Sequence, residues 1–415
     1  MSNTAAMEMQ QETQVSGSAV RTEIVVCLGQ WYTDSSVEHL QPLLAVLREA
    51  FRERAASTLI AYPVSDPQAE SWHSDGFTLQ PYQSTAGPST LQVAVASSYL
   101  DLYEVMRAHG SECGVLLGAE AQSLHAGAIC GLVDAVLDRK ADLALPRYSV
   151  RPNDGLINAA ILHPLTRAIF GVRADFPLAL DLALSARAAE KLAAAAQRFT
   201  AAGQPDALLW PSAEAAVNGF TIAEVTTGSR DIPLPAGSDL STILTQLSSS
   251  LFTEVETKAT YWQRTRPAAS VVVVGGSPEE SLAADPVEPD EISELVEAFR
   301  LGHGNLHEIW AMVLPPQTLL GIKRLSQMPA QSFAMADTLW VRIVYDFVLA
   351  HRMRTINRGH LLGALTPLYL AWVASHILAG QTNASGNPPE ALAKAFEADK
   401  PYLVSRWRWP DRFNP

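Results

Sequence analysis

Residues 141–185 read ADLALPRYSVRPNDGLINAAILHPLTRAIFGVRADFPLALDLALS, and this stretch decides the fold class. Its first apolar run, 143–146, has the length and composition of a buried β-strand. A polar loop follows, and a helical pattern then runs over 156–170 and ends at Gly171, a residue suited to a helix C-terminus. A strand that ends in a polar loop before a helix is typical of the ligand-binding edge of an α/β sheet. We therefore expect a substrate cleft at this loop.

Asp181 is an isolated acid in the apolar segment that follows the helical pattern. Its neighbours Leu180, Leu182 and Leu184 are apolar, so we expect its carboxyl group to be partly buried. Two interpretations fit this pattern: an acid that serves the cleft, or a structural acid that caps a turn. The residues alone leave both open.

The chain before this stretch alternates strands and helices. Strands are predicted at 22–28, 57–63 and 113–117. A helix that ends near Arg54 separates the first two, and the polar and aromatic residues 71–88 are interpreted as a loop. This order predicts a doubly wound, Rossmann-type α/β fold with a mostly parallel sheet and with ligands at the carboxyl ends of the strands.

Helical periodicity replaces the alternation after an acidic, proline-containing stretch near residue 290. We therefore divide the chain into four parts: a disordered tail over 1–20, an α/β domain over 21–266, a connecting segment over 267–290 and an all-helical C-terminal domain over 291–415. The apolar run 361–378 approaches the length that spans a bilayer, about 20 residues. It contains polar residues and has no comparable second run, so we interpret it as a buried helix and expect no transmembrane segment.

Composition limits the classes of partner and compartment. The net charge of −13 over 415 residues argues against binding to nucleic acid or to anionic membranes. Three cysteines, Cys27, Cys113 and Cys130, show no metal-type spacing, and their odd number indicates a reducing compartment. The first residues lack the basic-then-apolar order of a signal peptide. These features predict a cytoplasmic protein.

Several motifs resemble a known family. Pro164-Leu165-Thr166-Arg167 and the later stretch Pro177-Leu178-Ala179-Leu180-Asp181 resemble the acceptor-side motifs of GT-A-fold glycosyltransferases related to mannosylglycerate synthase and glucosyl-3-phosphoglycerate synthase. The family shows two glycines before the acid, and this chain does not. The resemblance continues through 361–375 and 400–408 and so covers most of the chain. It implies a GT-A-like sheet domain followed by a helical domain.

The resemblance also implies where a nucleotide-sugar donor binds. In the family, the loops after the first two strands and the end of the central strand hold the nucleotide. The matching positions of this chain are Leu28, Gly29, Gln30, Tyr32, Asp66 and Glu120. Asp66 is equally interpreted as a turn residue that has no ligand.

A divalent cation is implied at the end of the central strand, where GT-A enzymes place Asp-x-Asp. Two carboxylates there hold a cation against the diphosphate leaving group. This chain has a degenerate motif, Gly118-Ala119-Glu120, which lacks the first carboxylate. Asp231 stands near the position of a family histidine that also binds the metal. Glu120 with Asp231 is therefore the candidate site for Mg²⁺ or Mn²⁺, and we expect a weak or absent dependence on either ion.

The acceptor side is implied to hold the catalytic acid or base, Asp181, which positions or activates an acceptor hydroxyl. Candidate acceptor-binding residues, suited to a carboxylate or phosphate, are Arg147, Arg151, Asn158 and Arg167. The first functional hypothesis is thus a hexosyltransferase that transfers a sugar from a nucleotide-sugar of the GDP-mannose or UDP-glucose type to a small acceptor such as a glycerate. The second is a GT-A-fold binding or regulatory protein that has lost catalysis. A homo-oligomer is compatible with both.

Overall fold

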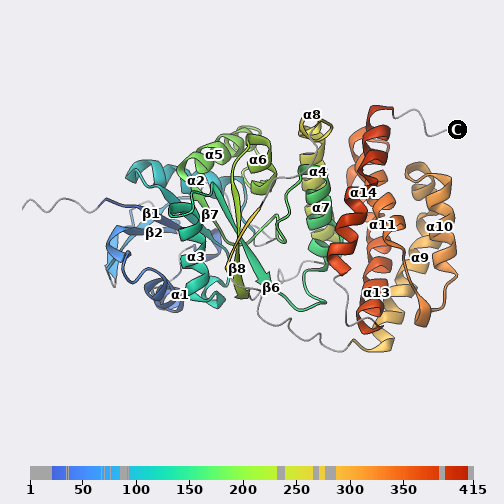
Figure 1. Ribbon diagram of the computed structural model, residues 1–415, viewed down its shortest axis with the longest axis horizontal. Helices are drawn as coiled ribbons and strands as arrows, with labels where there is room; N and C mark the ends of the chain where they lie inside the picture. Colours follow the sequence, from blue (N-terminus) through green and yellow to red (C-terminus); the bar gives the residue numbers. More distant parts are fainter. Residues whose placement is uncertain are drawn as a thin grey trace, which may run out of the picture.

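The structure is a computed structural model that describes residues 21–33, 35, 37–66, 68–69, 71–74, 76–84, 91, 93–230, 239–264, 271–275, 287–382 and 388–409. Within these ranges the strands form one nine-stranded sheet in the order β3-β4-β2-β1-β5-β7-β6-β8-β9. The sheet and its covering helices lie at one end of an elongated molecule, and a group of helices lies at the other (Figure 1).

The sheet is mostly parallel, as the sequence predicts. The strands are β1 (Ile24–Leu28), β2 (Thr58–Pro63), β3 (Trp72–Ser74), β4 (Phe77–Tyr82), β5 (Cys113–Leu117), β6 (Leu143–Ser149), β7 (Leu182–Ser185), β8 (Ile222–Ser229) and β9 (Val272–Val274). Strands β3 and β7 pair antiparallel to their neighbours, and all the other pairings are parallel. The α/β class is therefore confirmed.

The interpretation of 71–88 as a loop is wrong for its first part, where β3 and β4 form a hairpin. Gly76 turns the chain between them with φ of +87°, a conformation that glycine adopts without steric cost. Residues 85–90 of that segment lie outside the described residues.

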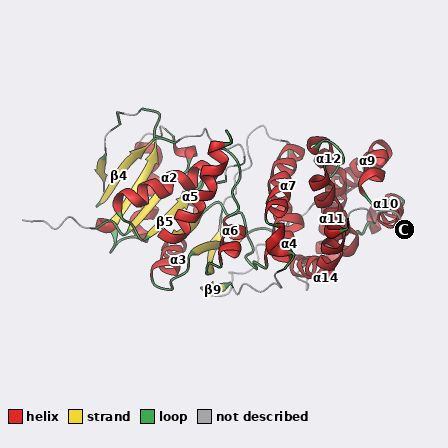
Figure 2. Cartoon of the chain, turned by 90° about the horizontal axis from the view of Figure 1, so that it is seen from above, coloured by secondary structure: helices red, strands yellow, loops and turns green. Residues whose placement is uncertain are grey.

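Helices cover both faces of the sheet, and side-chain alternation along β1 shows why. Ile24, Val26 and Leu28 pack with α1 (Val37–Ala50) and α3 (Ala126–Leu137), whereas Val25 and Cys27 pack on the other side with α2 (Ala96–His109) and α5 (Ala186–Ala201). Figure 2 shows α2 and α5 lying across the sheet. Both faces of the central strands are thus buried, which is typical of parallel sheets.

The regular elements after β9 are all helical within the described residues 287–382 and 388–409. They are α9 (Pro289–Val313), α10 (Pro316–Ser326), α11 (Asp337–Met353), α12 (Arg358–Gly363), α13 (Thr366–Thr382), α14 (Pro388–Arg408) and the 3₁₀ turn 330–332. The segment Arg358–Gln381 is the described helix that is long and apolar enough to cross a membrane, and 67% of its apolar window is buried inside the structure. This burial agrees with the interpretation of 361–378 as a core helix.

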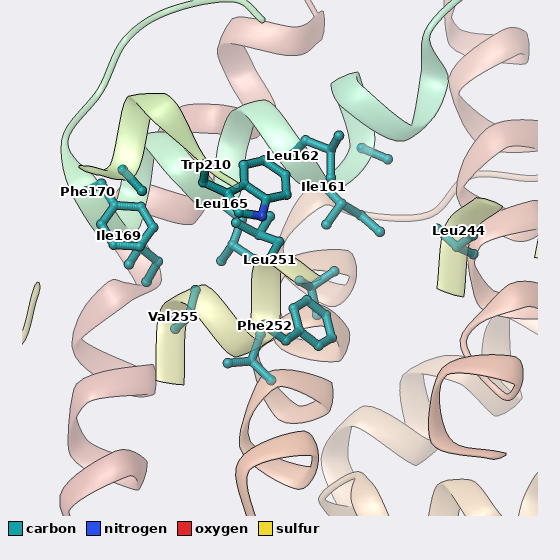
Figure 3. Close-up of a cluster of buried hydrophobic side chains, with 14 of the residues drawn as sticks. Ile161, Leu162, Leu165, Ile169, Phe170, Trp210, Leu244, Leu251, Phe252 and Val255 are labelled. Carbon is teal, nitrogen blue, oxygen red and sulfur yellow. The ribbon is translucent and has the colours of Figure 1, made fainter. Parts of the chain in front are cut away.

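Helices from the first part of the chain join this group. They are α4 (His163–Phe170), α7 (Leu240–Thr257) and α8 (Ala259–Trp262); α6 (Pro211–Asn218) lies between them and the sheet (Figure 1). α4 packs against α14, and α7 packs against α11 and α12. Figure 3 shows apolar side chains of α4 and α7 in one cluster with Trp210. The predicted boundary between an α/β domain (21–266) and a helical domain (291–415) therefore stays a prediction. Helices from the first range pack among those of the second.

A proline fixes how α4 meets α11. Residues Asn158–Leu162 form one π-helical turn, and Pro164 follows in the first turn of α4. Because proline has no N–H, it cannot bond the Ala160 carbonyl oxygen four residues earlier. That oxygen instead accepts a hydrogen bond of 2.9 Å from the buried Trp340 indole N–H of α11. The helix-breaking residue thus leaves an acceptor that α11 uses.

Arg167 fastens the other side of α4 to α14. Its guanidinium group donates hydrogen bonds of 2.5–3.1 Å to the carboxylates of Glu390 and Glu397, and its side chain is only 6% exposed. The Arg167 hydrogen bond lowers the pKa of Glu390 to about 2, against an opposing effect of burial. Since this pKa is lowered from 4.5, the stabilisation from the pair is present above pH 4.5 and is lost as the pH falls toward 2.

We predict that Arg167→Met lowers the free energy of unfolding by about 2 kcal/mol, since it removes the buried guanidinium group that hydrogen-bonds two partly buried glutamates. Arg173→Met is the matched control, because Arg173 lies 3.9 Å from the same Glu397 but is 58% exposed. Its cost should stay below about 0.5 kcal/mol. Urea unfolding at pH 7 measures the stability of both variants. Equal losses of stability would show that the buried contacts of Arg167 with Glu390 and Glu397 do not stabilise the packing of α4 on α14.

The imidazole ring of His351 in α11 is buried among apolar side chains. Its ring is fully buried against the edge of the Phe252 ring of α7, and neither ring nitrogen has a hydrogen-bond partner in the described part of the chain. Burial, together with the nearby charges of Arg358 and Arg354, lowers the pKa of His351 to about 4. The folded protein therefore holds this ring neutral.

Stability should consequently fall as the pH drops from 6.5 toward 4, because only the unfolded chain takes up the proton in that window. We predict that His351→Met reduces the stability difference between pH 7 and pH 5 by about 2 kcal/mol. His360→Met, at an exposed histidine of α12, should leave the difference unchanged. Urea unfolding of the three proteins at both pH values is the measurement. If wild type and His351→Met lose the same unfolding free energy between pH 7 and pH 5, the prediction is wrong.

Candidate functional site

The carboxyl ends of the central strands meet at one edge of the sheet, as predicted. The loop after β1 lies against the end of β5, where the Gly29 N–H donates to the Leu117 carbonyl oxygen at 3.0 Å. The Tyr32 hydroxyl group donates to the Gly118 carbonyl oxygen at 3.3 Å and accepts from the Ala121 N–H at 3.2 Å. The structure thus brings together two segments that the sequence separates by about ninety residues.

Asp181 lies at the centre of this edge, directly before β7. Because β7 runs antiparallel to β5, its first residue lies beside the last residues of β5. One carboxylate oxygen of Asp181 accepts from the Gly118 N–H at 2.9 Å, and the other accepts from the Tyr148 hydroxyl group at 2.8 Å. The expected partial burial is corrected: the Asp181 side chain is 0% exposed.

Arg230 is the ionic partner of Asp181, and the sequence analysis does not assign it to the site. Its Nε donates to an Asp181 carboxylate oxygen at 2.9 Å, and both side chains are fully buried. The same guanidinium group donates to the carbonyl oxygens of Ala119 and Glu120 and, at 3.0 Å, to the Ser123 hydroxyl oxygen. Burial lowers the pKa of Arg230, but the Asp181 carboxylate raises it more, so the guanidinium group stays charged.

Tyr148 of β6 is the second residue in contact with Asp181 that is not predicted as a site residue. Burial, followed by the Asp181 charge, raises the pKa of Tyr148 well above its usual value, so its hydroxyl group remains a proton donor. It also accepts from the Asp181 backbone N–H at 3.1 Å. The sequence signals for Tyr148 and Arg230 are only a tyrosine and an arginine near predicted strand ends, and neither identifies a partner.

Glu120, the candidate metal ligand, is exposed and takes a left-handed backbone conformation with φ of +57°. Such a conformation is uncommon for a residue with a side chain. Its carboxylate accepts a 2.5 Å hydrogen bond from the Gln122 side chain. Asp231, the second candidate ligand, lies outside the described residues. No group of three His, Cys, Asp or Glu side chains suited to a metal occurs within the described ranges.

The predicted nucleotide-binding residues of the first two loops differ in accessibility. The Leu28 side chain is buried in the core, and its carbonyl oxygen accepts from the Tyr82 hydroxyl group at 2.7 Å. Asp66 is exposed after β2, where its carboxylate accepts from the Gln68 N–H at 2.9 Å, the geometry of a turn residue. Leu28 is therefore unavailable through its side chain.

Gln30 joins a buried polar cluster at the same edge. Its amide nitrogen donates to the hydroxyl oxygens of Ser84 and Ser97 at 2.7 and 3.1 Å, and the Ser84 hydroxyl group donates to the Asp101 carboxylate. The Gln30 amide oxygen is buried and has no hydrogen-bond partner in the described part of the chain. Burial raises the pKa of Asp101 to about 7, partly offset by the Ser84 hydrogen bond.

The predicted acceptor residues gather only in part. Arg147 forms an ion pair of 2.8 Å with Asp175, and the Asn158 side chain donates to the Asp175 carbonyl oxygen at 2.8 Å. Arg151 lies in the exposed loop after β6 and pairs with Asp154 at 3.0 Å. Arg147 and Asn158 therefore meet at Asp175, whereas Arg151 lies in the loop that follows β6.

Arg167 does not belong with them, which corrects its assignment as an acceptor-binding residue. Its guanidinium donors contact Glu390 and Glu397 of α14, more than two hundred residues away in sequence. Glu224 of β8, which the sequence analysis does not single out, does belong there: its carboxylate accepts from the Asp175 N–H at 2.6 Å. Burial, with the Asp175 charge, raises the pKa of Glu224 to about 7.

No family model and no curated protein sequence matches this chain. Among solved structures, glucosyl-3-phosphoglycerate synthase from Mycobacterium tuberculosis, crystallised with Mn²⁺, UDP-glucose and phosphoglyceric acid, is similar with 14% sequence identity and a TM-score of 0.33. The match covers 56% of this chain and 79% of that chain. A likeness at this level establishes neither a shared family nor a shared activity.

We predict that Tyr148→Phe lowers the free energy of unfolding by about 1–3 kcal/mol, because the Asp181 N–H and carboxylate each lose a buried partner. Tyr99→Phe is the matched control. The Tyr99 hydroxyl group is also buried but has no hydrogen-bond partner among the described residues, so its removal should be neutral or stabilising. Denaturant unfolding compares the two, and an equal effect would show that the Tyr148 hydrogen bonds contribute nothing.

Proposed function

We propose that the chain is a GT-A-like glycosyltransferase-type protein that binds a nucleotide-sugar at the carboxyl edge of its sheet. The donor would be of the GDP-mannose or UDP-glucose type, and the acceptor a small molecule such as a glycerate. The proposal includes a cytoplasmic location and allows a homo-oligomer. It rests on the residues described above and on the motifs of residues 164–181.

The observation that supports it is the convergence of strand ends. The loop after β1, the degenerate motif 118–120 and the Asp181–Arg230 pair are in direct contact, and Tyr148 links them to β6 and its loop. Ligands of open α/β sheets bind outside the carboxyl ends of the strands. Gln30 and Glu120 would face the donor, and Arg147, Arg151 and Asn158 the acceptor.

The hydrogen bonds that occupy both carboxylate oxygens of Asp181 favour a second candidate function, a binding protein without turnover. A general base needs an accessible oxygen within hydrogen-bond distance of the proton that it removes. In this structure both Asp181 oxygens accept hydrogen bonds and the side chain has no exposed surface. Asp181 therefore serves catalysis only in a state in which Arg230 or Tyr148 releases it.

A thermal-shift screen with GDP-mannose, UDP-glucose and the bare diphosphates tests the first step. Ligand at about one hundred times its dissociation constant should stabilise the fold by about 2.7 kcal/mol. Binding followed by transfer of the sugar to glycerate or phosphoglycerate supports the enzyme, and binding without transfer supports the second candidate. Absence of binding for every nucleotide would refute both.

We predict that, if wild type transfers sugar, Asp181→Asn lowers turnover about 10²-fold or more while donor binding persists. The variant should also lose stability, because it leaves the buried Arg230 without its counter-charge. Asp142→Asn is the matched control, since Asp142 is a buried acid that pairs with Arg187 directly before β6, away from this edge, so turnover should not change. Rates are compared for protein shown to be folded by circular dichroism. Unchanged turnover in folded Asp181→Asn would remove Asp181 from the mechanism.

A further inference from the structure

A cation already occupies the end of the central strand. The Arg230 guanidinium group contacts the Asp181 carboxylate, the carbonyl oxygens of Ala119 and Glu120 and the Ser123 hydroxyl oxygen. Carboxylate, carbonyl and hydroxyl oxygens are the ligand types that Mg²⁺ and Mn²⁺ prefer. The side chain of Arg230 has no exposed surface, so these oxygens lie around a fixed positive charge.

The backbone also prevents the first carboxylate of an Asp-x-Asp motif from being accommodated. A Cβ atom built at Gly118 would lie 2.9 Å from the Leu180 carbonyl oxygen and 3.2 Å from its Cβ atom. The first distance is shorter than real Cβ contacts, and the neighbouring atom belongs to the backbone, which cannot turn aside. Any side chain at 118 would therefore displace the segment that carries Asp181.

The charge of Asp181 is balanced without a metal ion. Arg230 offsets the charge of Asp181, which leaves Glu120 as the remaining carboxylate of the motif 118–120. A divalent cation placed beside Ala119 or Glu120 would meet the guanidinium charge and would find both carbonyl oxygens already bonded. The described residues therefore do not fit the Mg²⁺ or Mn²⁺ that the family resemblance implies.

We propose that Arg230 is a built-in cation that takes the place of a divalent metal, so that this edge binds a nucleoside diphosphate equally well with and without Mn²⁺. This inference rests on the proposed function, because its first test requires that the protein bind a nucleotide. The other test, binding of Mn²⁺ to the protein alone, is independent of any nucleotide. Arg230 acts here as a positioning residue that neutralises Asp181 and holds the loop after β5.

Calorimetric titration of the full chain with GDP and with UDP, in EDTA and in Mn²⁺, is the first test. The dissociation constants should differ by less than about threefold between the two buffers. Affinity that rises about tenfold or more with Mn²⁺ would overturn the proposal. If neither nucleotide binds in either buffer, the proposed function fails, and the Mn²⁺ titration then decides this inference alone.

In that second test the protein is titrated with Mn²⁺ and free ion is followed by electron paramagnetic resonance. Wild type should show no saturable site, and a site with a dissociation constant below about 0.1 mM would overturn the proposal. Asp231→Asn, tested alongside, shows whether any such site depends on that residue.

Variants of Arg230 show whether its positive charge supports nucleotide binding or only holds the fold together. Arg230→Met should weaken nucleotide binding in EDTA about tenfold or more, with Mn²⁺ restoring part of it, because Asp181 is then uncompensated. The double variant Arg230→Met/Asp181→Asn removes both charges and should regain binding that is insensitive to EDTA; it also serves if the single variant does not fold. Arg358→Met, at a partly exposed ion pair with Glu256, is the control. Folded Arg230→Met with wild-type affinity in EDTA would overturn the proposal.

Discussion

The buried ion pair between Asp181 and Arg230 is the interaction on which the sheet's carboxyl edge depends. Taking two charges out of water is costly, and the mutual attraction offsets the cost only when further hydrogen bonds satisfy both groups. Here the Gly118 N–H and the Tyr148 hydroxyl group complete the carboxylate, and backbone carbonyl oxygens complete the guanidinium group. The pair thereby joins the ends of β5, β6 and β8 to the start of β7, which enters the sheet in the opposite direction.

A second constraint acts at the other end of the molecule, where α4 connects the sheet to the C-terminal helices. α4 follows the loop that begins at the end of β6, so its position is tied to the site. α11 reaches it through the Ala160 carbonyl oxygen, which Pro164 cannot bond, and α14 reaches it through Arg167. Lys400 of α14 also donates to the Ile169 carbonyl oxygen at 3.2 Å. The helical part is therefore fastened to the segment that leads into β7 and Asp181.

The sequence predicts those features that arise from local patterns. β5 is predicted at 113–117 with its observed bounds, because this apolar run has strand length, follows Ser111 and Glu112 and ends at Gly118. β3 and β4 are missed because β3 is only three residues long and Pro81 interrupts the short alternating run of β4. Their pairing is decided by Gly76 and by β2. The burial of Asp181 is underestimated because its counter-charge, Arg230, comes 49 residues later. Arg167 is misassigned for the same reason, since its glutamates lie more than two hundred residues away.

Gly118 shows that the backbone of residues 118–120 and the ion pair form a single arrangement. The Leu180 carbonyl oxygen approaches Gly118 so closely that a side chain there is excluded, and this approach lets the Gly118 N–H reach the Asp181 carboxylate at 2.9 Å. A carboxylate at 118 and the observed position of Asp181 are therefore mutually exclusive. With Asp181 held in this way, its charge requires a buried cation, which Arg230 supplies. The glycine at 118, the burial of Asp181 and the arginine that follows β8 are thus linked by one close contact between the end of β5 and the residues before β7.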